Sequence, residues 1–429
     1  MSVRSAGLLL VLACLGVLWP AAPPAGASPQ IKYGVQDDAW LVFGPGTLES
    51  RLTTLDRLGV ETVRFYLRWD QVARRKPANA RNHADPAYDW GLVDNLLQGL
   101  RRHRIEPLLT FLGTPEWANG GRSFNFAPSD RSSFADFAFA AAKRYPWVVK
   151  WTIWNEPNQR RWLRPTTPQV YVSMLLNPGY AALHAATPGV RVAGGVTAPR
   201  AASDGVSPVA WIRGMAAAGA RLDAYAHHPY PVRPQTETPW TGGCRHCSTI
   251  TLAELDRLLR EVRRSFGAKR IWLTEYGYQT NPPDRTLGVP WATAARHLAS
   301  AAHRAYAAPY VDVLIHFLVV DETTPAGWQS GFFTTAGVRK PTYTAFRFPL
   351  AQVSRRGATV RVWGQIRPRS GRQPFRLRRF AGGRWAWLGG TRSTNARGFF
   401  AATVSAGAGS LLQVWSPRDR ASGLALRVR

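Results

Sequence analysis

The feature that most constrains this chain is a regular alternation of short β-rich runs and helical stretches between residues 31 and 350. In the helical stretches, apolar residues recur every three or four positions, which places them on one helix face. Eight β-rich runs can be counted, and they begin near Ile31, Thr62, Pro107, Val148, Val190, Leu222, Arg270 and Val311. Eight strands with intervening helices predict an α/β fold, a (β/α)8 or TIM barrel with enlarged loops. A doubly wound sheet is disfavoured, because it usually has fewer strands and no glycine-rich phosphate loop follows the first run.

The pattern changes near the C-terminus. Residues 351–429 contain no helical periodicity, and strand-like runs such as residues 359–363 are separated by Gly, Ser and Asn turns. This alternation predicts a small all-β sandwich. The chain is therefore expected to consist of a signal peptide over residues 1–27, a barrel over residues 28–350 and a β-sandwich over residues 351–429.

The charge is uneven along the chain. The whole sequence carries a formal net charge of +29, and residues 351–429 supply +15 of it from 16 Arg against one Asp. A basic strand face of this kind either stays in solvent or adheres to an anionic cell-envelope polymer or polyanionic glycan. A nucleic-acid partner is disfavoured, because the chain has export features and no recognised nucleic-acid module.

The N-terminus has the layout of a secretory signal. Arg4 precedes an apolar run over residues 8–19, and small residues at 25–27 follow it. We expect cleavage after Ala27 and export of the mature protein to the cell envelope or the medium. Lipoprotein processing at Cys14 is the alternative, although the apolar run continues beyond that cysteine. No later stretch offers the roughly 20 apolar residues of a transmembrane helix.

Two cysteines remain after removal of the signal peptide, Cys244 and Cys247, in the spacing C-x-x-C. In an oxidising compartment such a pair most simply forms a small loop disulfide. A zinc site with His246 and the nearby His227 and His228 is the alternative. A redox pair is disfavoured, because the predicted helix begins only after both cysteines.

Two short motifs end predicted strands with a carboxylate. The fourth run ends in WNEPN, which contains Glu156, and the seventh ends in WLTEYG, which contains Glu275. All strand C-termini of a closed parallel barrel open onto one face, so both carboxylates are expected in the same cleft. Retaining glycoside hydrolysis uses such a pair about 5 Å apart, one as proton donor and later base, the other as nucleophile. Together the motifs favour a glycosidase, whereas a single Glu at a strand end is more often a solvated side chain.

With these two motifs in this order, the chain resembles glycoside hydrolase clan A, whose acid/base and nucleophile lie on strands four and seven of a barrel. The WNEPN motif and the His-Pro-Tyr after the sixth run are most similar to families 39 and 5. The resemblance is expected to cover roughly residues 31–345 and not the tail. It implies that Glu156 is the acid/base and Glu275 the nucleophile.

The resemblance also implies roles for neighbours of the pair. Asn155 matches the residue that hydrogen-bonds the sugar 2-hydroxyl, and Arg64 matches the strand-two arginine that keeps the nucleophile ionised. His228 and Tyr230 match the strand-six pair whose tyrosine donates to the nucleophile. His227, in contrast, is expected to be a neutral histidine packed at the strand end.

Two departures from the clan concern the substrate. The clan commonly has a Trp at the end of strand eight, where this chain has Phe317, and we expect either Trp328 from the following loop or Phe317 itself to replace it. Strand three ends without the His of many family 5 enzymes. Other expected sugar contacts are Asp38, Trp40 and Trp117, because rings stack on pyranose faces and carboxylates bridge hydroxyls.

These observations predict an exported retaining β-glycosidase that cleaves β-linked poly- or oligosaccharides. No metal or other cofactor is implied, because the two-carboxylate mechanism is complete without one. A transglycosylase with the same site is a close variant. A catalytically silent glycan- or envelope-binding protein is the alternative from a different class, and the presence of both carboxylates opposes it.

Overall fold

The computed structural model describes residues 27–244, 247–324 and 326–429. The expected signal peptide up to residue 26, the alternative processing site at Cys14 and His246 of the alternative zinc site lie outside these residues. Among the helices within them, none combines the length and the apolar character that a membrane crossing requires.

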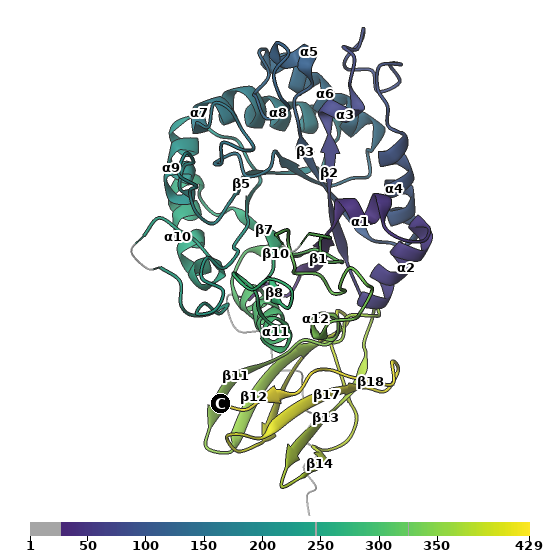
Figure 1. Ribbon diagram of the computed structural model, residues 1–429, viewed down its shortest axis with the longest axis vertical. Helices are drawn as coiled ribbons and strands as arrows, with labels where there is room; N and C mark the ends of the chain where they lie inside the picture. Colours follow the sequence, from purple (N-terminus) through teal and green to yellow (C-terminus); the bar gives the residue numbers. More distant parts are fainter. Residues whose placement is uncertain (1–26, 245–246, 325) are drawn as a thin grey trace, which may run out of the picture.

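Eight parallel strands close into a barrel, as the alternating pattern predicted (Figure 1). Neighbours in the chain pair with each other, and the first strand pairs with the last to complete the ring. The eight strands are β1 (Lys32–Gln36), β2 (Thr62–Arg68), β3 (Glu106–Leu112), β4 (Lys150–Ile153), β5 (Arg191–Thr197), β6 (Ala224–His227), β7 (Arg270–Tyr276) and β10 (Val311–Phe317). Because all of them are parallel, their C-terminal ends open onto one face.

A ring of helices surrounds the barrel (Figure 1). The longer helices are α2 (Leu48–Leu58), α4 (Gly91–Arg102), α6 (Arg131–Arg144), α8 (Asn177–Ala186), α9 (Pro208–Ala217), α10 (Leu255–Phe266), α11 (Trp291–Ala307) and α12 (Pro341–Arg347). Polar side chains begin several of them: Thr47, Asp130 and Ser207 each accept a backbone N–H of the first turn of α2, α6 and α9. Short elements lie in the loops: α1 (Asp38–Phe43), α3 (Trp69–Val72), α5 (Glu116–Asn119), α7 (Pro168–Val170), a π-helical turn (Tyr171–Leu176), a 3-10 turn (Leu252–Glu254), β8 (Thr280–Asn281) and β9 (Val289–Pro290).

The interior of the barrel is largely apolar but contains a few polar side chains. Arg64, Thr110 and Thr152 on β2, β3 and β4 are completely buried there. A buried charge is costly unless it is paired and hydrogen-bonded. The buried Arg64 guanidinium therefore requires hydrogen-bond acceptors around it, and side chains of the candidate active site supply them.

The C-terminal segment forms two antiparallel sheets, as the sequence predicted. One contains β11 (Leu350–Arg356), β12 (Thr359–Gln365) and β16 (Phe399–Ser405). The other contains β13 (Pro374–Ala381), β14 (Arg384–Trp387), β15 (Arg392–Ser393), β17 (Leu411–Ser416), β18 (Ala421–Ser422) and β19 (Leu426–Arg427). Apolar residues of both sheets, including Val362, Leu377, Phe400 and Val414, pack together in one core. The segment is thus a β-sandwich, and its first strand, β11, begins at Leu350.

The sandwich packs against the barrel beside α11 and α12 (Figure 1). Trp363 and Phe399, from the outer side of the three-stranded sheet, belong to the same buried cluster as the barrel residues Tyr33 and Tyr306. Arg397 donates to the Ile31 carbonyl at 2.8 Å. The sandwich therefore covers an apolar surface of the barrel, whatever else it binds.

Candidate active site

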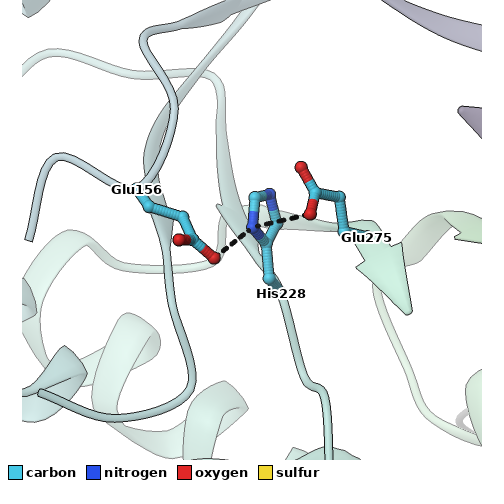
Figure 2. Close-up of side chains that lie close together, drawn as sticks. All are labelled: Glu156, His228 and Glu275. Carbon is cyan, nitrogen blue, oxygen red and sulfur yellow. Dashed lines mark hydrogen bonds and ion pairs between the residues drawn. The ribbon is translucent and has the colours of Figure 1, made fainter. Parts of the chain in front are cut away.

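Glu156 and Glu275 come together at the C-terminal face of the barrel. Glu156 lies three residues beyond the end of β4, and Glu275 is the penultimate residue of β7. One carboxylate oxygen of each lies within 4.8 Å of the other and of a ring nitrogen of His228. Figure 2 shows the imidazole between the two carboxylates. The fold thus brings the two predicted catalytic residues into one site.

The backbone that carries Glu156 has an uncommon conformation. Trp154 and Glu156 have positive φ angles, 71° and 38°, which are unfavourable for residues other than Gly. The Trp154 indole N–H donates to the Trp162 carbonyl at 2.6 Å, and the Glu156 N–H donates to the Val196 carbonyl at 2.9 Å. Such strain persists only where the surroundings hold it, and it is concentrated at functional sites.

Glu275 is surrounded by groups that stabilise its ionised form. The Arg64 guanidinium lies 2.5 Å from one carboxylate oxygen, and the Tyr230 hydroxyl donates to the other at 3.0 Å. The Tyr66 hydroxyl lies at 3.3 Å. Burial alone would raise the pKa of Glu275, but the neighbouring His228 and Arg64 and these hydrogen bonds hold it below its ordinary value.

Arg64 has an acceptor on each side of its guanidinium. Nη1 donates to Gln36 as well as to Glu275, Nη2 donates to Asn155 at 2.8 Å, and Nε donates to Thr110 at 3.0 Å. Arg64 therefore fixes the side chain of Asn155 and that of Glu275 together. Neither Gln36 nor Tyr66 was predicted from the sequence, although a polar residue at the end of a buried strand is a signal that could have indicated Gln36.

His228 links the two carboxylates. Its Nδ1 lies 3.0 Å from Glu156 and 3.6 Å from Glu275, and the ring is fully buried (Figure 2). Tyr230 lies two residues further along the loop after β6. The strand-six pair therefore reaches both carboxylates.

His227 has a structural role, as expected. Its two ring nitrogens are already engaged, by the Thr197 hydroxyl at 2.8 Å and the Ile250 carbonyl at 2.9 Å. Burial lowers its pKa to about 3, so the ring is neutral. A histidine in these surroundings has no free nitrogen for zinc, which removes one ligand from the alternative zinc site.

The structure pairs Cys244 with Cys247 in the loop between β6 and α10, with their Cα atoms 5.6 Å apart. This separation is within the range of disulfides. Oxidation of the pair in the exported protein stays a prediction.

A cavity of about 1260 Å³ opens over the carboxylate pair. Trp328, from the loop after β10, lies on its wall, with its ring centroid 4.6 Å from that of Tyr230 and 5.7 Å from that of Phe317. The rings of Trp328, Tyr230 and Phe317 therefore form an aromatic wall of the cavity at and beyond the end of β10. The predicted contacts Asp38, Trp40 and Asn155 also line the cavity. Further lining residues, not predicted, include Gln159, Arg161, Trp162, Arg200, Leu287 and Glu322.

Asp38 lies at the edge of this cavity and is half-buried. One of its oxygens accepts the Tyr66 backbone N–H at 2.7 Å, and the other accepts the Gln36 amide at 3.0 Å. Burial raises the pKa of Asp38 to about 6. Asp38 thus faces the cavity with a carboxyl that takes up a proton more readily than an ordinary Asp.

The two other predicted tryptophans differ in position. Trp40, the third residue of α1, lines the cavity. Trp117 does not: its indole N–H donates to the Ala73 carbonyl at 2.7 Å, and its ring packs edge-on against the buried Trp69. The structure gives no support to a sugar contact at Trp117, because strand three's loop turns its ring into the helix layer.

Glu156, His228 and Glu275 together offer ligand atoms that could hold a cation. The Arg64 guanidinium already neutralises Glu275, and a second positive charge beside it would be repelled. The arrangement therefore suits proton transfer and nucleophilic attack by two carboxylates better than metal binding.

No protein-family profile and no curated sequence match this chain. Solved structures with the same fold do. A family 39 glycoside hydrolase from the gut symbiont Bacteroides cellulosilyticus WH2 superposes with a TM-score of 0.58 and 18% identity, over 87% of this chain and 79% of that one. A family 39 enzyme from Xanthomonas axonopodis pv. citri superposes with a TM-score of 0.57 and 15% identity, over 94% of this chain and 98% of that one. A family 5, subfamily 18 enzyme from Streptomyces cattleya in complex with GlcNAc superposes with a TM-score of 0.53 and 17% identity, over 74% of this chain and 79% of that one.

The chain therefore has the barrel fold of the clan A glycoside hydrolases, as its two Glu motifs predicted. Among the families of that clan, its fold resembles families 39 and 5. Coverage of 94% of 429 residues must include much of residues 351–429, so the expected limit of the resemblance at residue 345 is wrong.

Proposed function

We propose that the mature protein is an exported retaining glycoside hydrolase that cleaves β-linked poly- or oligosaccharides. The observation that carries this proposal is the carboxylate pair, with oxygens within 4.8 Å of each other at the ends of strands four and seven. Retaining enzymes have this short separation, whereas inverting enzymes leave about 6.5–9.5 Å for a water molecule.

The different surroundings of the two carboxylates support different roles. Glu275, held ionised by Arg64 and Tyr230, is suited to attack the anomeric carbon. Glu156, which has no arginine beside it among the described ion pairs, is suited to give its proton to the departing oxygen. The first step breaks the glycosidic bond and forms a Glu275–sugar ester.

The second step restores the enzyme. Glu156, now a carboxylate, takes a proton from water, and the resulting oxygen nucleophile displaces Glu275 from the anomeric carbon. Two inversions at the same carbon give overall retention. Asn155, fixed by Arg64, is positioned to bind the sugar 2-hydroxyl, a contact that strengthens in the transition state.

The cavity supports a carbohydrate substrate of more than one residue. Its volume of about 1260 Å³ exceeds what one small ligand fills, and it combines aromatic rings with carboxylates. Trp40, Trp162 and Trp328 present ring surface, and Asp38 and Glu322 present oxygens. This mixture suits pyranose faces and their hydroxyl groups.

The test is the proton NMR spectrum of the first-formed product from an aryl β-glycoside or β-linked polysaccharide that the protein hydrolyses. The proposal expects the β-anomer first; release of the α-anomer would contradict it.

Variants separate the two roles. Glu275→Ala should lose activity on every substrate, whereas Glu156→Ala should lose about 10²- to 10⁴-fold on poor leaving groups and far less on dinitrophenyl glycosides, which need little protonation. Glu116→Ala is the matched control, because this carboxylate follows β3 without lining the cavity.

For the basic tail we propose attachment to an anionic cell-envelope polymer or glycan. Its +15 charge over residues 351–429 supports this, because such a surface attracts polyanions.

A further inference from the structure

One face of the sandwich combines exposed tryptophans with arginines. We define the Trp/Arg face by the side chains that share one side of the sheet formed by β13, β14 and β17: Arg376, Arg378, Trp385, Trp387 and Trp415. The strand register brings them together, since Arg376 is opposite Trp415 and Arg378 is opposite Trp387. Paired residues of antiparallel strands point to the same side of a sheet.

This face points away from both apolar cores. The alternate residues of the same strands, Leu377 and Val414 among them, fill the core of the sandwich. The other sheet presents its own outer side, with Trp363 and Phe399, to the barrel. The Trp/Arg face is therefore the outer side that remains in solvent.

The exposure of its rings is unusual. Trp385 is 38% exposed and Trp387 is 44% exposed, and all four residues of the edge strand β14 are exposed. Large aromatic side chains gathered on one exposed face mark binding sites more often than chance.

The arginines are stacked on these rings. The guanidinium of Arg376 lies 3.9 Å from the ring centroid of Trp387, and that of Arg378 lies 4.7 Å from the centroid of Trp385. Arg378 is further held by Gln413 at 2.7 Å and Ser422 at 3.0 Å. The cations are thus placed in advance, which lowers the entropic cost of binding a ligand.

No carboxylate within the described residues neutralises Arg376 or Arg378. The single acidic residue of residues 351–429 is Asp419, and its ion pairs are with Arg347 and Arg369. Two stacked guanidiniums without a counter-ion are complementary to an anion, and the flat indoles beside them are complementary to a ring.

We propose that the Trp/Arg face is a second glycan-binding site, for an acidic polysaccharide whose pyranose rings lie on Trp385 and Trp387 while its carboxylates pair with Arg376 and Arg378. None of these residues lines the catalytic cavity, so the site binds polymer without occupying the carboxylate pair. The inference rests on the proposed attachment role of the tail and gives that role a location and a ligand class.

The experiment measures binding of the full-length mature protein to three probes by affinity electrophoresis. Polygalacturonate offers both pyranose rings and carboxylates, its fully methyl-esterified form offers rings without charge, and linear polyphosphate offers charge without rings. Wild type should bind polygalacturonate at least about ten-fold more tightly than the ester, because charged hydrogen bonds to Arg are lost in the ester.

Two double variants locate the site. Trp385→Ala with Trp387→Ala should weaken polygalacturonate binding at least about ten-fold while binding of polyphosphate changes little, because only the first probe stacks on rings. Arg376→Gln with Arg378→Gln keeps both indoles and should weaken polygalacturonate binding by a similar factor. This arginine variant therefore also tests the proposal if the tryptophan variant does not fold.

The matched control is Arg356→Gln with Arg361→Gln, two exposed arginines of the other sheet. It removes the same charge and should change polygalacturonate affinity less than about three-fold, because it leaves the arginines that pair with the ligand in place and removes only screened, long-range attraction. An equal loss in the control and in Arg376→Gln with Arg378→Gln would overturn the site.

Two more readouts separate this proposal from its rivals. Turnover of small soluble glycosides should be the same in wild type and in the variants of the sandwich. Glu275→Ala should bind polygalacturonate as wild type does. Loss of catalysis and loss of binding are therefore distinguishable. Light scattering should give the same mass for wild type and the tryptophan variant. A dimer that the tryptophan variant dissociates, with unchanged polymer affinity, would overturn the proposal and make the face an interface between copies.

Discussion

The hydroxyl of Tyr230 contributes to the ionisation of Glu275, to which it donates at 3.0 Å. We predict that Tyr230→Phe moves the acidic limb of kcat/KM to higher pH. In the proposed mechanism Glu275 attacks only as a carboxylate, so activity should fall as the pH drops through its pKa, and loss of a donor to the carboxylate raises that pKa. The rate at the optimum should also fall about 10- to 100-fold.

The control for this prediction is Tyr88→Phe. The Tyr88 hydroxyl donates to the Ala80 carbonyl at 2.6 Å, outside the cavity, so its removal should leave the pH profile unchanged. The pH dependence of kcat/KM over the acidic range measures both variants. If the acidic limb of Tyr230→Phe coincided with that of wild type, Tyr230 would only shape the cavity.

Neighbouring residues of the same type show what sequence can and cannot predict at this scale. His227 and His228 are adjacent, yet one ends β6 with both nitrogens hydrogen-bonded and the other lies between two carboxylates. From the sequence, His228 was expected beside the carboxylates, through its match to the clan motif, and His227 was expected to be packed at the strand end. Gln36 and Tyr66 escaped prediction, because their roles depend on side chains of other strands that meet only in the closed barrel. Trp117 shows the opposite error, a ring near the barrel mouth that packs inward.

At the scale of elements, Asn158 ties the strained turn of Glu156 to the neighbouring loop after β5. Its side chain donates to the Val206 carbonyl and accepts the Ala198 N–H, both at 2.9 Å, and it is fully buried. We predict that Asn158→Ala lowers the free energy of unfolding by about 2 kcal/mol, because buried backbone groups lose their partners.

The measurement is urea unfolding followed by tryptophan fluorescence, together with kcat on an aryl glycoside. Activity should fall as well, since the turn that carries Glu156 loses a support. The exposed Asn82→Ala serves as control and should stay within about 0.5 kcal/mol of wild type. Unchanged stability in Asn158→Ala would mean that other contacts hold the turn.

The elements themselves were predictable where their signal is local. The eight predicted strand starts lie within two residues of the observed ones, because each barrel strand is a short β-branched and aromatic run between turns. The π-helical turn at Tyr171–Leu176 and the β8–β9 pair were not predicted. Their hydrogen bonds depend on tertiary packing, and neither has a periodicity of its own.

At the scale of the whole molecule, the two outer sides of the sandwich have different surroundings. The sequence left open whether the tail covers an apolar patch or attaches to a polymer, and these roles use opposite sides. Trp363 and Phe399 lie in the buried cluster of the barrel, whereas the Trp/Arg face is in solvent. The structure establishes the covering contact, and the attachment remains the proposal tested above.

The covering contact predicts the behaviour of a chain that ends at Leu350. Such a chain would expose Tyr33 and Tyr306, against which Phe399 now packs, and would lose the ion pair between Arg397 and Glu61. Loss of the two buried rings Trp363 and Phe399 removes about 4–6 kcal/mol of apolar burial. That is a large part of the roughly 5–15 kcal/mol by which a domain is stable.

We therefore expect the barrel alone to melt at a much lower temperature than the full-length protein and to aggregate, as measured by differential scanning fluorimetry and light scattering. Full-length Trp363→Ala, which removes one of these contacts and keeps the rest, should lie between the two. A soluble barrel with the melting temperature of the full-length protein would mean that the contact contributes little to stability. Because Trp363→Ala keeps the natural chain end, a lower melting temperature in this variant is due to the lost contact with the barrel. A truncated barrel that melts early while Trp363→Ala does not would instead point to an effect of the new chain end.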